Sequence, residues 1–229
     1  KNSSSSSTTQ NVTINLQRSR TATISVRSVH GYKDVDIDTE EEMIQWRVVS
    51  QDDVSIAFRK EEGKVLRLDK EDAAIHAFLP TEDICGLGVI INGDFSTDPS
   101  RRHLIYDETT KAIIRKISCL YAGLIKECIF EGKDNSADLI KALLPYYDYR
   151  LIHLTKNTFD QEFVCALKQV LGSSFTLTNV APAWLNPCDY EIISDNNFDR
   201  ACVSVPGVIP FMKFLGCRED DRTGVLSKL

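Results

Sequence analysis

FLPTEDICGLGVIINGDFSTDPSRRHL, residues 78–104, is the stretch that decides the fold. Within it the apolar run Leu87–Ile91 predicts a strand that breaks at Asn92–Asp94. Upstream of this stretch, apolar and polar residues alternate with a period of two, and polar or turn-forming clusters separate the runs. We therefore expect a mainly antiparallel sheet of about five or six strands. The strand candidates are residues 21–29, 44–49, 54–58, 65–68, 76–79 and 87–91.

The period of the apolar residues changes after residue 104. Apolar side chains recur at helical spacing from Ile113 to Cys128, and Gly132 follows as a stop signal. This pattern predicts a long, buried helix that covers one face of the sheet. Beyond it we expect a helix over 136–144, a strand over 150–154, a helix over 158–172, and short strands at 175–180, around Trp184 and at 190–193.

These elements predict an α/β (α+β) fold in three parts. Residues 1–20 begin with a serine-rich segment and are expected to be a disordered linker or an expression remnant. Residues 21–132 form the sheet and its long helix. Residues 133–229 form a second, smaller α/β unit with an unassigned tail.

Composition excludes several classes of protein. The chain has 229 residues and a net charge of −6, which disfavours nucleic-acid binding through a general basic field. No apolar run is long enough to span a bilayer. The seven cysteines are widely spaced and never form Cys-x-x-Cys, so neither a disulfide framework nor a zinc site is expected. We expect a reduced, cytoplasmic protein.

The usual signatures of a self-sufficient enzyme are missing from the sequence. It contains no Gly-x-x-x-x-Gly-Lys-Ser/Thr, Gly-x-Gly-x-x-Gly, His-Glu-x-x-His or Gly-x-Ser-x-Gly. The four histidines are isolated, and His76 and His153 are expected to be packed within strands. The acidic run at residues 38–42 is interpreted as the solvated start of a helix.

Arg101 and Arg102 are the candidate functional residues. Two adjacent arginines in a loop are by themselves most simply surface residues. Here, however, they follow an apolar strand and a turn predicted at Asp98–Ser100. A guanidinium mounted in this way is suited to a phosphate, with which it forms paired, charge-assisted hydrogen bonds. Because the chain has no phosphate-cradling loop, the nucleotide would have to be bound elsewhere.

These residues also support a resemblance to a family. The chain resembles the GHKL-type ATPases, above all sacsin and sacsin-like bacterial ATP-binding proteins, and more distantly the middle domain of the heat-shock-ninety chaperones. The similarity is best over residues 44–104 and weaker to about residue 195. The segments that carry it are Phe78–Thr81, Gly86–Leu87, Ile91–Phe95 and Ser100–Leu104, preceded by Ile44–Ser50 and Val54–Ala57. Residues 175–187 are similar to a further segment of these proteins.

The resemblance implies a middle, or transducer, segment of a chaperone-like ATPase. Arg101 matches the arginine that reaches the γ-phosphate of ATP, whereas Arg102 replaces an acidic residue and is only a neighbouring candidate. The family's nucleotide-binding motifs are absent, and Gly88 stands where the family usually has proline. ATP with Mg is therefore expected mainly outside this chain, on an upstream lobe of the same protein, and no cofactor is expected in this chain alone.

Two functions remain open at this stage. In the first, Arg101 serves an ATPase whose partner is the upstream lobe, with a protein client or self-association as further possibilities and no membrane or nucleic-acid partner. In the second, the chain is a non-enzymatic α/β interaction domain that binds a protein through a strand edge or its tail. On that interpretation the arginines are ordinary surface residues.

Overall fold

The structure is a computed structural model that describes residues 9–16, 20–29, 32–39, 43–130, 136–154, 158–174, 190–192, 205–215 and 217–219. Nine strands form its main sheet. They are β1 (Thr9–Leu16), β2 (Arg20–Val29), β3 (Tyr32–Thr39), β4 (Met43–Gln51), β5 (Val54–Glu61), β6 (Lys64–Leu66), β7 (Ala74–Ala77), β8 (Leu79–Ile84) and β9 (Ile90–Asn92). The other elements are α1 (Glu108–Phe130), α2 (Ser136–Leu143), the 3-10 helix η1 (Tyr149–Leu154), α3 (Thr158–Ser174), β10 (Tyr190–Ile192), α5 (Val208–Phe214) and β11 (Cys217–Glu219).

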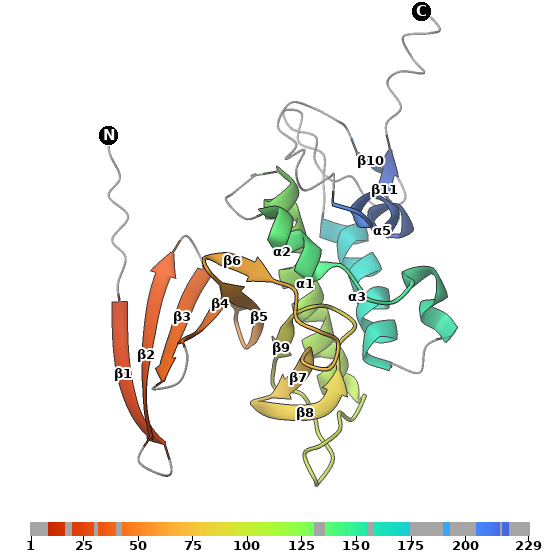
Figure 1. The fold of residues 1–229 in the computed structure, drawn as a ribbon. Helices are drawn as coiled ribbons and strands as arrows, with labels where there is room; N and C mark the ends of the chain where they lie inside the picture. Colours follow the sequence, from red (N-terminus) through yellow and green to blue (C-terminus); the bar gives the residue numbers. More distant parts are fainter. Residues whose placement is uncertain are drawn as a thin grey trace, which may run out of the picture.

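The main sheet runs in the order β1-β2-β3-β4-β5-β9-β7-β8, and β6 pairs with one end of β5. All pairings in it are antiparallel except that between β7 and β9, which is parallel. The expected α+β fold with a mostly antiparallel sheet is therefore confirmed. Figure 1 shows β1, β2 and β3 standing to one side of the helices, while α1 crosses the central part of the sheet.

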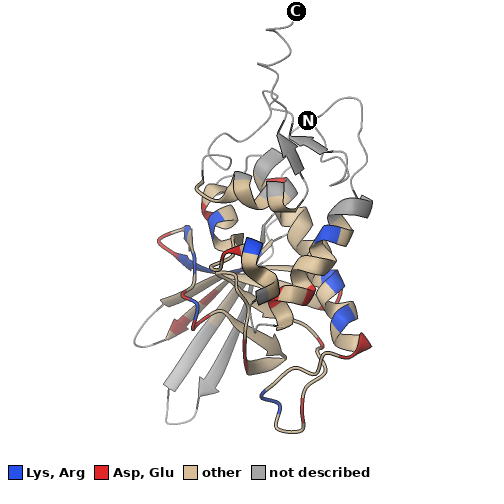
Figure 2. Ribbon diagram, turned by 90° about the vertical axis from the view of Figure 1, so that its right-hand side faces the viewer, with Lys and Arg blue, Asp and Glu red and all other residues tan. Residues whose placement is uncertain are grey.

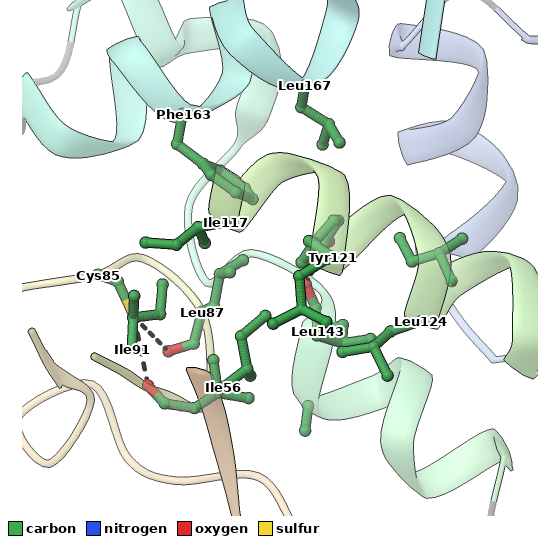
Figure 3. Close-up of a cluster of buried hydrophobic side chains, with 14 of the residues drawn as sticks. Ile56, Cys85, Leu87, Ile91, Ile117, Tyr121, Leu124, Leu143, Phe163 and Leu167 are labelled. Atoms are coloured by element: carbon green, nitrogen blue, oxygen red, sulfur yellow. Dashed lines mark hydrogen bonds between the residues drawn. The ribbon is translucent and has the colours of Figure 1, made fainter. Parts of the chain in front are cut away.

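The core lies between α1 and the centre of the sheet. Ile56 of β5 and Ile91 of β9 are fully buried, and so are Ile117 and Tyr121 of α1. Figure 3 shows these side chains converging from the sheet and the helix. Burying an aliphatic or aromatic side chain of this size contributes about 1.5–3 kcal/mol. The Tyr121 hydroxyl donates to the Leu143 carbonyl at 2.6 Å, which satisfies the one polar atom of that ring.

The helices after residue 136 extend the same core. Phe163 of α3 meets the Tyr121 ring edge-on, with the ring centroids 5.1 Å apart, and stacks on Phe159. The expected helices were correct, since α2 ends just before Pro145 and α3 begins at Thr158. One buried cluster contains residues from both sides of the boundary expected at residue 132.

Several expectations about elements were wrong. The sheet has nine strands where about five or six were expected, and the strand expected at 87–91 is β9, which begins at Ile90 and includes Asn92. The expected linker of residues 1–20 contains β1, which pairs with β2 along eight residues, so its backbone is satisfied by the strand ladder. A helix start was expected at 38–42, but Asp38 lies in β3 and pairs with Met43 of β4. The expected strand at 150–154 is η1, and His153 in it is exposed. Residues 76–79 are not one strand but the end of β7, a turn at Phe78 and the start of β8.

Asp148 explains why residues 150–154 form a 3-10 helix and not the expected strand. Its backbone carbonyl accepts from the Leu151 N–H at 2.8 Å, and its carboxylate accepts from the Arg150 N–H at 3.1 Å. A side chain that bonds the backbone two residues on favours a turn over a strand. The strands expected at 175–180 and around Trp184 lie outside the described residues, and β10 occupies 190–192. No helix in the described part of the chain is long and apolar enough to cross a membrane.

Candidate functional site

The two arginines lie in the connection between β9 and α1. This connection begins at Gly93, where a side chain would overlap Ile113 of α1, so the glycine lets the chain pass close to the helix. Past it, the turn predicted at Asp98–Ser100 is present. Arg101 N–H donates to the Asp98 carbonyl at 2.9 Å, and Pro99 occupies the second position of the turn.

Arg101 has an unusual backbone conformation. Its φ is +58°, in the left-handed region that non-glycine residues rarely occupy. It stands at the fourth position of the turn, where glycine is common. Such a conformation persists only where the surroundings fix it, and it is found often at functional sites.

The carboxylate of Asp98 is what fixes the loop. It accepts from the Ser100 hydroxyl at 2.6 Å, from the Arg102 N–H at 2.9 Å and from the His103 N–H at 3.2 Å. The Ser100 hydroxyl, followed by the two backbone donors, lowers the pKa of Asp98 below its usual value. The carboxylate therefore stays ionised and keeps these bonds throughout the neutral range.

The edge strand β8 holds the other side of the loop. Glu82 N–H donates to the Arg102 carbonyl and Leu104 N–H donates to the Asp83 carboxylate, both at 2.7 Å. His103 lies 3.6 Å from the carboxylates of both Glu82 and Asp83. Figure 2 shows acidic and basic residues close together on this loop, below the helices.

The two guanidinium groups differ in their surroundings. Arg102 pairs with Glu82 at 3.4 Å, although both side chains are more than half exposed. Arg101 is exposed, and no ion pair or side-chain hydrogen bond is found for its guanidinium among the described residues. The structure thus keeps the two predicted residues together, and among the described residues Arg102 has a carboxylate partner whereas the Arg101 guanidinium has none.

The sequence did not reveal a second set of contacts, around Gly86 and Gly88. Gly86 N–H donates to the Asp160 carboxylate of α3 at 2.8 Å, and the Gly86 carbonyl accepts from Tyr146 N–H at 2.7 Å. Gly88 N–H donates to the Ala142 carbonyl at 2.9 Å. These bonds attach α2 and α3 to the segment that leads out of β8.

Both glycines are required by close packing. A side chain at Gly86 would overlap the Tyr147 ring and approach Asp160 Oδ2 to 2.5 Å, and one at Gly88 would overlap the Arg67 side chain. A proline at 88, usual in the resembled family, would also lack the N–H that bonds Ala142. Glycine at position 88 therefore has a local structural reason.

Two buried groups near these glycines are structural. Asp160 is 2% exposed, and burial raises the pKa of its carboxyl to about 7, against the opposing effect of the Gly86 N–H. Burial also raises the pKa of the Cys85 thiol to about 12, and its Sγ lies 3.3 Å from the Val89 carbonyl (Figure 3). A thiol held protonated in this way is not a nucleophile.

Sites for other ligands are few in the described part of the chain. No group of three or more His, Cys, Asp or Glu residues there could hold a metal ion. A shallow depression between α1 and α3 is lined by Lys111, Arg115, Glu162, Cys165 and Gln169, among others. Among the described cysteines, Cys85 and Cys128 are buried, and Cys119 and Cys165 are exposed.

Comparisons of the chain with protein-family models, curated proteins and solved structures gave no match. The resemblance to GHKL-type ATPases therefore rests on the quoted motif residues alone.

Proposed function

We propose that this chain is the transducer segment of a GHKL-type, chaperone-like ATPase of the cytoplasm. Arg101 would be supplied to the γ-phosphate of ATP, which an upstream lobe of the same protein holds together with Mg. The observation that supports this proposal is the difference in surroundings between the guanidinium groups of Arg101 and Arg102. The Arg101 guanidinium has no described partner on a backbone fixed by Asp98, whereas Arg102 is paired with Glu82.

This loop would make one contact with ATP, between the Arg101 guanidinium and the phosphate oxygens. An exposed guanidinium can form two parallel hydrogen bonds with phosphate oxygens. The other basic side chains of this loop, Arg102 and His103, lie beside carboxylates of β8, so the adenine, the ribose and most of the triphosphate would lie on the upstream lobe. When that lobe closes, Arg101 would stabilise negative charge on the phosphoryl group in the transition state.

Coupling to the rest of the chain would pass through β8. This strand bonds the backbone of Arg102 and Leu104 at one end, and at Gly86 and Gly88 the following segment is bonded to α2 and α3. A displacement of the arginine loop would therefore strain contacts that reach both helices. This arrangement supports a segment that relays nucleotide state.

The test joins this chain to its natural upstream segment and measures ATP turnover. Arginines that contact a transferring phosphoryl group contribute about 10³-fold or more to kcat. Arg101→Ala should lower kcat at least tenfold with a smaller change in KM, since the contact strengthens in the transition state. Arg102→Ala is the matched control and should stay within about twofold, which is under about 0.5 kcal/mol.

A second candidate function is a protein-interaction domain. It is favoured by Phe78 and Leu79 at the turn between β7 and β8, whose side chains are 74% and 61% exposed. If the joined protein neither binds nor hydrolyses ATP, this second function replaces the first. Partner binding should then respond to Phe78→Ser and be indifferent to Arg101→Ala.

A further inference from the structure

The arginine loop, residues 96–105, is closed at its base. Ile105 N–H donates to the Ser96 carbonyl at 2.8 Å, and Asp98 N–H donates to the His103 carbonyl at 2.9 Å. These bonds join the outgoing and returning arms of the loop, as paired strands are joined in a β-hairpin. The loop is therefore a short hairpin with a tight tip.

The base of the loop is anchored on the core. Ser96 N–H donates to Thr110 Oγ1 at 3.1 Å, and Thr110 is fully buried in the first turn of α1. Leu104, on the returning arm, is buried and belongs to the core cluster. The tip, residues 99–103, is exposed. Figure 1 shows the loop projecting beyond the start of α1, on the side away from α2. The base is thus fixed to the core helix, while the tip is accessible from outside.

Asp98 closes the tip of the loop. Its carbonyl accepts from Arg101 N–H at 2.9 Å, and its carboxylate accepts from the N–H groups of Arg102 and His103. Three consecutive backbone donors are therefore satisfied within the loop. The bonds fix the peptide groups on both sides of the Arg101 Cα, which explains how this residue keeps a φ of +58°. An anion at the tip would have to be bound by side chains, because these three N–H groups already have acceptors.

We propose that this loop is pre-organised for phosphate, so that it holds the Arg101 backbone in one conformation with and without ATP. Closure of the upstream lobe, and not a rearrangement of the loop, controls when the guanidinium meets the γ-phosphate. This inference rests on the proposed ATPase function and describes how that site is regulated. A donor fixed in advance needs no reorganisation at the moment of reaction, which is the condition for strong electrostatic stabilisation.

Amide hydrogen exchange in the chain alone tests whether Asp98 fixes the tip. In the wild type, the N–H groups of Arg102 and His103 should exchange about tenfold more slowly than in an unstructured peptide, or slower still. Asp98→Ala should remove this protection, and Asp98→Asn should retain most of it because an acceptor oxygen remains. Asp94→Ala is the matched control, since Asp94 is exposed in the same connection. Circular dichroism confirms that each variant is folded. Wild-type exchange at the unstructured rate would overturn the proposal.

The backbone conformation of Arg101 is then compared with and without nucleotide. Backbone ¹³C chemical shifts report φ and ψ, and in the protein joined to its upstream segment those of Arg101 should indicate the left-handed region in both states. The probe is a non-hydrolysable ATP analogue with Mg. Shifts that enter the left-handed range only after the analogue is added would overturn the proposal, because ATP would then order the loop.

Turnover of the joined protein separates a failure of this inference from a failure of the ATPase function. Asp98→Ala should lower kcat about fivefold or more with a smaller change in KM, and Asp98→Asn should recover most of the loss. In the Arg101→Ala background, Asp98→Ala should have no further effect, since Asp98 acts through Arg101. If Arg101→Ala lowers kcat and Asp98→Ala does not, the pre-organised loop is refuted and the ATPase function stands. If Arg101→Ala has no effect, the ATPase function itself is refuted.

Discussion

The carboxylate of Asp160 makes the stability of this fold depend on pH in a distinctive direction. It is 2% exposed, and burial raises the pKa of Asp160 from 3.8 to about 7, so the folded state binds this proton more tightly than the unfolded state does. The stabilisation from protonation is complete below about pH 4 and is lost as the pH rises through 7. Most acidic groups with shifted pKa values here, such as Asp34 and Asp98, shift the other way and destabilise only in acid.

The magnitude follows from the two pKa values. Between pH 5 and pH 8 the contribution of Asp160 to the free energy of unfolding should fall by about 3 kcal/mol. Asp160→Asn removes this pH dependence and keeps an oxygen that can accept from the Gly86 N–H. The free energy of unfolding of the wild type, minus that of the Asn variant, should therefore decrease by about that amount over this range.

Urea unfolding followed by circular dichroism at pH 5, 6, 7 and 8 measures this difference. Asp160→Ala is the control, because it lacks both the charge and the acceptor. It should be less stable than the Asn variant by about 1–3 kcal/mol at every pH, since the Gly86 N–H is left unpaired. A wild-type-minus-Asn difference that changes by less than about 0.5 kcal/mol between pH 5 and pH 8 would refute the reasoning.

Three further predictions concern the segment from Gly86 to the arginine loop. Gly86→Ala should lower the free energy of unfolding by about 1–3 kcal/mol in urea titrations, because its methyl group overlaps the Tyr147 ring; a change under about 0.5 kcal/mol contradicts the packing. Asp98→Ala should speed tryptic cleavage after Arg101 and Arg102, since three loop bonds are lost, and an unchanged cleavage rate would count against a loop fixed by this carboxylate. Arg101→Gly should leave stability unchanged or raise it by about 1 kcal/mol, because glycine accepts φ of +58° without strain; a clear loss of stability on thermal unfolding would show that the side chain supports the fold.

Local periodicity predicted the strands and helices whose apolar residues all lie on one buried face. The apolar side chains of β5 alternate and those of α1 recur at helical spacing, so both were found, although β5 continues to Glu61 and α1 begins at Glu108. β3 was missed although Val35 and Ile37 alternate with acidic residues. Asp34 and Asp36 are held in the sheet by cross-strand pairs with Arg47 and Arg27, which no local pattern shows.

The candidate site was only partly predictable, for a similar reason. Asp98 and Pro99 predicted the turn, and the loop geometry agrees. The bond between Gly86 and Asp160 joins positions 74 residues apart, and nothing local to either residue signals it. Likewise, the pairing of Arg102 with Glu82 depends on how β8 docks, which no local sequence pattern reveals.

The most direct test of the central claim is the rate of ATP hydrolysis at saturating ATP by the protein that includes the upstream segment. The account predicts that Arg101→Ala lowers this rate at least tenfold, that Arg101→Lys restores part of it, and that Arg102→Ala stays within about twofold of wild type. Equal rates for wild type and Arg101→Ala, or a larger loss with Arg102→Ala, would contradict it.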